Sequence, residues 1–199
     1  MHELLEVRIG AHADAWASAG FVVEAGGRLL IGPTTIVFGE GDGITSVAIE
    51  GLDPGELDGA PLVAPGAPAG AADHPNGVTA IDHLVVRSPD IDRTSDALQA
   101  AGLELRRERR FGAGDSTIRQ SFFWLGRTIL ELVGDDTAHG PGPALLWGLA
   151  LTANDLDRLA EVAGDAATPP KPAVQRGRMI LSLHGLGIPI AVLTPHVNG

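Results

Sequence analysis

The feature that most constrains the fold of this chain is a repeat within its own sequence. Residues 82–93, DHLVVRSPDIDR, align without a gap on residues 147–158, WGLALTANDLDR. Further along, SFFWLGRTILELVG at 121–134 aligns on SLHGLGIPIAVLTP at 182–195. Two matches in the same order, with a similar spacing, indicate two copies of one structural module.

Each copy has the pattern of a β-α-β-β-β unit. Its first strand is apolar and rich in β-branched residues, and its helix starts at an Asp cap and ends at Gly. In the first copy the pattern predicts a strand at 81–88, a helix at 90–102, and strands at 103–111, 117–125 and 128–134. In the second it predicts a strand at 146–152, a helix at 155–164, a weak strand near 173–175, and strands at 178–184 and 188–194.

The N-terminal segment, residues 1–52, has the pattern of a third and shorter copy. Residues 53–77 consist mostly of Ala, Gly and Pro and have no helix or strand period, so we interpret them as a linker. The longer C-terminal region then spans 78–196, with modules at 78–135 and 145–196. The fold class is α+β, with tandem βαβββ modules that form a cup-shaped open barrel and an extra N-terminal half-module.

Three half-modules leave the N-terminal one without a partner inside the chain. We therefore expect self-association, or packing on the flank of the barrel, to cover its sheet face, and we predict a homodimer. The net charge of −11 argues against nucleic-acid or anionic membrane partners. The chain has no cysteine, which excludes disulfides, thiolate metal sites and a cysteine nucleophile. It shows no signal-peptide pattern and no membrane-length apolar run, so we expect a cytoplasmic protein.

Two modules that open with IDHLVV and close with ILELVG resemble the vicinal oxygen chelate superfamily. That superfamily includes glyoxalase I, extradiol dioxygenases, fosfomycin-resistance enzymes and bleomycin-binding proteins. The run HPNGVTAIDHLVVRSPDIDRT, with RQSFFWLG after it, is similar to uncharacterised glyoxalase-like proteins of that group. The resemblance covers residues 78–196 and implies a cup that binds a small oxygenated molecule, in the enzymes through one divalent metal ion such as zinc, manganese, nickel or iron.

The resemblance also implies where metal ligands lie, on the first and last strands of each module. In the first module these positions hold His83 and Glu131, the predicted metal ligands and catalytic residues. In the second they hold Gly148 and Val192, whose side chains cannot coordinate a metal. A third ligand then has to come from Gln120, His184 or another subunit. The alternative is that His83 and Glu131 form a hydrogen-bonded pair with no metal.

Strand alternation predicts the lining of the cup. If His83 faces inward, so does Arg87. The strand at 117–125 presents either Gln120, Phe122 and Trp124 or Arg119, Ser121 and Phe123. We favour the first set as substrate-binding residues, together with Trp147 and Arg87. Ordinary core packing is the alternative for these aromatic residues.

The run RRERR at 106–110 suggests an anion site, although a solvated strand edge explains such mixed charges more often. Alternation places Arg107 and Arg109 on one face and the other three residues on the opposite face.

Three functions are compatible with these patterns. The first is a metal-assisted lyase, isomerase or dioxygenase, in which Glu131 is a metal ligand or also a proton shuttle. The second is a non-catalytic protein that sequesters a drug or metabolite in an aromatic cup, as bleomycin-binding relatives do. The third is a degenerate domain with a structural or regulatory role.

Overall fold

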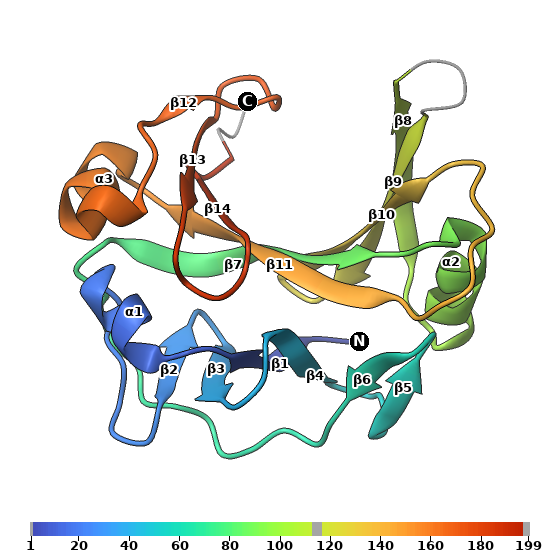
Figure 1. Cartoon of the computed structure of the whole chain (residues 1–199), viewed down its shortest axis with the longest axis horizontal. Coiled ribbons are helices and arrows are strands. Elements are labelled where there is room, and N and C mark those ends of the chain that lie inside the picture. The colour runs from blue at the N-terminus through green and yellow to red at the C-terminus, as the bar shows by residue number, and fades with distance from the viewer. Residues whose placement is uncertain (1, 113–116, 197–199) are drawn as a thin grey trace.

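The computed structural model describes residues 2–112 and 117–196. It confirms the α+β class that the sequence predicts (Figure 1). An eight-stranded sheet contains both predicted modules. The first module comprises β7 (Val78–Arg87), α2 (Ile91–Ala100), β8 (Leu105–Phe111), β9 (Ile118–Leu125) and β10 (Thr128–Asp135). The second comprises β11 (Leu145–Ala153), α3 (Leu156–Ala163), β12 (Lys171–Pro172), β13 (Met179–Leu183) and β14 (Ile190–Leu193), with a short 3₁₀ turn at Gly164–Ala166. The weak strand predicted near 173–175 lies slightly earlier, at β12.

The two modules are joined along their first strands, in the sheet order β12-β13-β14-β11-β7-β10-β9-β8. Strands β7 and β11 run antiparallel, and Leu84 lies opposite Leu149, its equivalent in the sequence repeat. Each first strand also pairs in parallel with the last strand of its own module. The register therefore has the two-fold symmetry that the repeat predicts. The sheet curls but stays open, with β8 and β12 as its edges (Figure 1).

The Asp caps predicted for the two helices form in both modules. The side chain of Asp90 accepts a hydrogen bond from the Arg93 backbone N–H at 3.0 Å, and Asp155 accepts the equivalent bond from Arg158 at 2.9 Å. Each bond satisfies a backbone donor that a helix N-terminus leaves free. Within the described ranges, no helix is long and apolar enough to cross a membrane.

The N-terminal region forms a six-stranded sheet of order β2-β3-β1-β4-β6-β5. Its elements are β1 (Leu4–Gly10), α1 (Ala13–Ser18), β2 (Arg28–Ile31), β3 (Thr34–Gly39), β4 (Gly43–Ile49), β5 (Gly55–Leu57) and β6 (Ala60–Leu62). Strand β1 pairs in parallel with β3 and antiparallel with β4, which in turn pairs in parallel with β6. This sheet therefore repeats the paired-module connectivity with shorter units, rather than forming one half-module.

The predicted linker at 53–77 is wrong over its first part, because it contains β5 and β6. These strands have three residues each, too few for a strand period to appear in the sequence. They form because β6 extends the edge of β4, where Val47 pairs with Leu62, and because the Ala60 side chain is buried.

The N-terminal sheet packs against the eight-stranded sheet on the side away from its opening (Figure 1). One continuous apolar core includes Val47 and Ile49 of β4 together with Leu84, Val86 and Leu130 of the larger sheet. The N-terminal sheet face is therefore covered within the chain, by packing on the other sheet rather than by self-association. The homodimer stays a prediction, without the uncovered face that motivated it.

Candidate functional site

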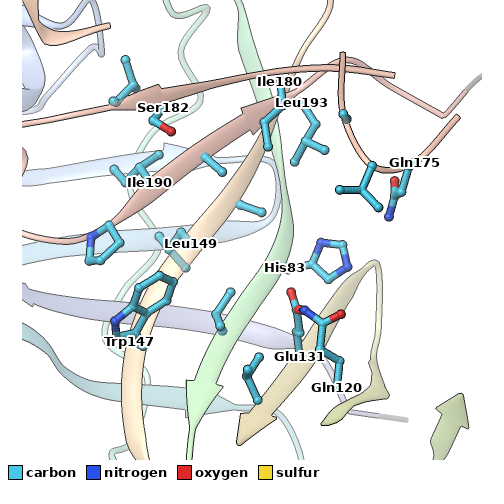
Figure 2. A pocket seen from close by; sticks show the side chains of 18 of the residues that line it. His83, Gln120, Glu131, Trp147, Leu149, Gln175, Ile180, Ser182, Ile190 and Leu193 are labelled. Atoms are coloured by element: carbon cyan, nitrogen blue, oxygen red, sulfur yellow. The ribbon is translucent and has the colours of Figure 1, made fainter. Parts of the chain in front are cut away.

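A cavity of about 490 Å³ lies in the curve of the eight-stranded sheet, and we call it the cup cavity (Figure 2). Strands of both modules line it, mostly with aliphatic and aromatic side chains. The lining includes Val85, Phe122, Val133, Trp147, Leu149, Val174, Ile180, Ile190 and Leu193. Such a mainly apolar cavity with a few polar groups is typical of a small-molecule site.

Polar groups line both walls of the cup cavity. Gln175, Ser182 and His184 lie in the second module, and the first module contributes a cluster around His83. His83 comes from β7, Glu131 from β10 and Gln120 from β9, and Figure 2 shows the three side chains close together. Strand alternation explains this cluster, because Leu84 and Leu130 point to the opposite face and enter the core. The predicted inward orientation of Gln120 and Phe122 matches the structure, which places Arg119, Ser121 and Phe123 among the buried residues.

His83 is held by a buried carboxylate that the sequence analysis did not single out. Its Nδ1 lies 2.6 Å from Oδ2 of Asp82, and Oδ1 of Asp82 lies 3.1 Å from Nη2 of Arg178. Arg178 is only 3% exposed. Because the carboxylate occupies Nδ1, the other ring nitrogen, Nε2, is the one left for a ligand.

The pKa of Asp82 reflects two opposing effects. Burial by itself raises it, but the hydrogen bond and charge of His83, followed by those of Arg178, outweigh burial and hold the pKa well below its usual range. Asp82 is therefore ionised near neutral pH, and its carboxylate accepts a hydrogen bond from the Nδ1–H of His83. It acts as a positioning residue for the imidazole.

Glu131 has a different partner. Its Oε1 accepts a hydrogen bond from Nε2 of Gln120, and Oε1 of Gln120 in turn accepts one from Nε of Arg109. Burial raises the pKa of Glu131, while the charges of His83 and Arg109 and the Gln120 hydrogen bond oppose that rise. A carboxyl group with a raised pKa beside a cavity is suited to proton transfer.

The alternative of a direct His83–Glu131 hydrogen bond is wrong. Between these two described side chains there is neither a hydrogen bond nor an ion pair; His83 pairs with Asp82, and Glu131 with Gln120. Both still line the same wall of the cup cavity, so one ligand can contact both.

The wall made by the second module is closed at the position equivalent to His83. A Cβ atom added to Gly148 would lie 2.5 Å from the backbone oxygen of Pro189. Val192, at the position equivalent to Glu131, is fully buried. This module therefore lacks the ligand side chains, and its backbone leaves no room for one at residue 148.

The close approach at Gly148 makes a testable prediction. We expect Gly148→Ala to lower the free energy of unfolding by about 1–3 kcal/mol, because the contact is to backbone that has to move. Urea denaturation followed by circular dichroism measures the change. Gly39→Ala is the control, since an added Cβ there meets nothing within 4 Å. Equal stabilities of the two variants would contradict this reading of residue 148.

The donor set of the cup cavity does not complete a metal centre. His83 and Glu131 supply two ligands, whereas catalytic zinc sites usually have three from the protein. Gln120, proposed as a third ligand, already engages Glu131 and Arg109 through its amide. Within residues 2–112 and 117–196, no group of three or more His, Cys, Asp or Glu is placed to hold a metal ion. The described residues thus do not fit the metal site that the resemblance implies.

Two of the predicted substrate-binding residues lie outside the cup cavity. Trp124 lines a neighbouring hollow, and it is 41% exposed. Arg87, at the exposed end of β7, places its Cζ 5.6 Å from the centroid of the Trp147 ring. Trp147 itself lines the cup cavity, as does His184. Alternation alone does not reveal that Arg87 and Trp124 lie beyond the cavity, because it fixes a face but not a position along the strand.

No family model and no curated protein matches the sequence. Solved structures do match the fold. A mutant of 4-hydroxymandelate synthase from Streptomyces coelicolor aligns with a TM-score of 0.63 at 15% identity, over 99% of this chain and 94% of that one. An extradiol ring-cleaving dioxygenase from B. fuscum aligns with a TM-score of 0.62 at 13% identity, over 98% of this chain and 73% of that one.

The chain has the vicinal oxygen chelate fold. Because these alignments span nearly the whole chain, the fold includes the N-terminal sheet, whereas the sequence resemblance covered only residues 78–196. At such low identities the vicinal oxygen chelate likeness concerns the fold alone. Function has to be argued from the cup cavity itself.

Proposed function

We propose that the cup cavity binds a small molecule with an apolar body and an oxygen-bearing head, and that Glu131 transfers a proton on that head. The observation that carries this proposal is the difference in chemical character between the two walls of the cup cavity. Glu131, with its raised pKa, and His83 lie on the wall of the first module, whereas the wall of the second module is mostly aliphatic and aromatic, with Gln175, Ser182 and His184 as its polar residues. A ligand that fills the apolar part therefore presents its polar end to Glu131 and His83.

The roles follow from the hydrogen bonds. Gln120 holds one oxygen of Glu131, which leaves the other oxygen to accept a proton from the ligand and to return it. His83 contacts the ligand oxygen through Nε2, because Asp82 holds Nδ1. The reaction class is a proton shift, of the kind that an isomerase or a lyase performs.

Hydrogen exchange tests this proposal without knowledge of the natural substrate. A panel of small hydroxy acids, oxo acids and phenols is screened by thermal shift, and each bound compound is incubated with the protein in D₂O. We expect the protein to exchange a carbon-bound proton of at least one bound compound, as followed by NMR, and Glu131→Gln to slow this exchange by about 10²-fold or more. Equal exchange with Glu131→Gln would refute the role of Glu131.

Glu131 also predicts a stability difference that depends on pH. A carboxyl whose folded-state pKa is raised stabilises the fold below its unfolded pKa, and this stabilisation is lost as pH rises through the folded pKa. We therefore expect Glu131→Gln to raise the free energy of unfolding at pH 8 by about 0.5–2 kcal/mol. Near pH 4 the difference should vanish, since Glu131 is then protonated. Urea denaturation at both values checks the sign, and a variant less stable at pH 8 contradicts it.

Non-catalytic binding is the second candidate, and the closed second wall favours it. With Gly148 packed against Pro189 and Val192 buried, the second module presents no polar side chain to a ligand from the two positions equivalent to His83 and Glu131. A binding protein needs no polar side chain at these positions to orient a metabolite or a drug. Under this alternative, bound compounds depend on His83 and Glu131 for affinity, but their carbon-bound protons do not exchange with D₂O.

A further inference from the structure

A second hollow, of about 660 Å³, adjoins the cup cavity and shares His83, Phe122 and Gln175 with it. Five guanidinium groups line this hollow, and the only carboxylate among its described lining residues is that of Asp82. We call it the arginine hollow. Its arginines are Arg106 and Arg107 of β8, Arg127 of the β9–β10 turn, and Arg176 and Arg178 from the segment before β13.

Four of these five charges are uncompensated within residues 2–112 and 117–196. Arg178 forms an ion pair with Asp82. The other four have no ion pair or side-chain hydrogen bond to any residue in the described part of the chain: Arg106, Arg107, Arg127 and Arg176. The chain as a whole carries 25 acidic and 14 basic residues. In so acidic a protein, carboxylates are abundant, so four unpaired arginines around one hollow point to a ligand that supplies the negative charge.

A β-bulge brings two consecutive arginines to this hollow. Leu105 pairs with Phe123 and Arg107 with Phe122, so two steps along β8 match one step along β9. The predicted alternation, which placed Arg106 on the face opposite Arg107, is therefore wrong at this point. Such bulges re-aim side chains.

The outward-facing charges of the same strand have partners. Glu108 accepts a hydrogen bond from Oγ of Ser121 at 2.9 Å, and Nε of Arg110 lies 2.8 Å from Oδ2 of Asp136. The strand-edge explanation that was favoured for RRERR thus describes Glu108 and Arg110, but not Arg106 and Arg107.

Aromatic rings hold the two bulge arginines in place of carboxylates. The Cζ atom of Arg106 lies 4.2 Å from the Trp124 ring centroid, and that of Arg107 lies 5.1 Å from the Phe122 centroid. Stacking uses the flat face of a guanidinium and leaves its N–H edges available. Those edges match the paired oxygens of a phosphate group.

We propose that the arginine hollow binds a phosphate ester or diphosphate carried by the ligand of the cup cavity. This inference rests on the proposed function for the link to the cup, through the shared His83, Phe122 and Gln175. A single carboxylate leaves most of the four free charges uncompensated, whereas a diphosphate balances them. The substrate class is therefore a phosphorylated small molecule whose oxygen-bearing head reaches Glu131.

Pyrophosphate tests the site on its own, because it has no head group for Glu131. We expect isothermal titration at low ionic strength to show saturable binding that weakens as salt is added. The double variant Arg107→Gln/Arg176→Gln should weaken this binding about tenfold or more, since each charge-assisted contact is lost. Arg110→Gln, which removes an arginine already paired with Asp136, is the matched control and should bind as the wild type does.

The comparison arm uses citrate, a tricarboxylate whose total charge near neutral pH is close to that of pyrophosphate. Binding of pyrophosphate at least tenfold tighter than that of citrate supports the phosphate assignment. Equal binding of the two anions, unchanged affinity in the double variant, or an equal loss in Arg110→Gln overturns it. Glu131→Gln should leave pyrophosphate affinity unchanged, so a failure of proton transfer and a failure of the anion site give separate results.

Discussion

Replacing Arg178 by methionine should lower the free energy of unfolding by about 3–5 kcal/mol. Arg178 is buried, and its guanidinium lies 3.1 Å from Asp82, 2.7 Å from Oε1 of Gln175 and 2.6 Å from the backbone oxygen of Thr194. Methionine fills much of the same volume but leaves the largely buried Asp82 carboxylate with His83 and, at 3.4 Å, Oγ1 of Thr152 as its partners in the described part of the chain. Urea denaturation near pH 7 measures the loss.

The double variant Asp82→Asn/Arg178→Met separates charge from packing. It leaves no buried charge unpaired, so we expect it to recover a substantial part of the stability lost in Arg178→Met. A single variant within about 1 kcal/mol of the wild type, or a double variant no better than the single one, would show that the Asp82–Arg178 pair is not the cause.

The lowered pKa of Asp82, caused first by His83 and then by Arg178, makes the fold sensitive to acid. A carboxyl whose folded-state pKa is lowered contributes stability above its unfolded pKa, and this contribution is lost as pH falls below that value. For Asp82 the ordinary value is 3.8, so the loss begins near there and continues at lower pH. Between pH 7 and 3, we expect the stability of Asp82→Asn to fall less steeply than that of the wild type.

Local sequence patterns predicted the parts of the fold that depend on local structure. The repeat placed Leu84 and Leu149 in equivalent strands, and the sheet pairs them with one another. The Asp caps of both helices were predicted from single residues, because capping involves a side chain and a backbone N–H three residues away. His83 and Glu131 were also placed on one wall correctly, since strand alternation and the module resemblance agreed there.

The remaining features depend on contacts that no local pattern records. The Asp82–Arg178 ion pair joins residues far apart in sequence, so Asp82 looked like an ordinary polar residue at a strand start. The bulge in β8 turns Arg106 toward the arginine hollow, and no glycine in β8 marks the bulge in the sequence. The strands β5 and β6 exist because the edge of β4 accepts them, although their composition is that of a loop.

Trp16 links the N-terminal sheet to the cup cavity, and Trp16→Ala should lower the free energy of unfolding by about 3–5 kcal/mol. The side chain is fully buried in α1 and packs against the rings of Phe21 and Phe38 at centroid distances of 4.9 Å and 5.3 Å. Its Nε1 donates a 2.9 Å hydrogen bond to the backbone oxygen of Leu186. Leu186 belongs to the turn between β13 and β14, which leads into the cavity wall at Ile190.

The milder variant Trp16→Phe isolates this hydrogen bond, because it keeps an aromatic ring and leaves the Leu186 carbonyl buried without its donor, at a cost of about 1–3 kcal/mol. If the N-terminal sheet supports the cup, the loss should be local to the second module. Amide hydrogen exchange should then speed up in β14, and at the Leu149 N–H that donates to Pro189, more than in β8 and β9. If exchange speeds up equally in β14 and in β8 and β9, Trp16 stabilises the whole chain uniformly and does not act through the Leu186 turn.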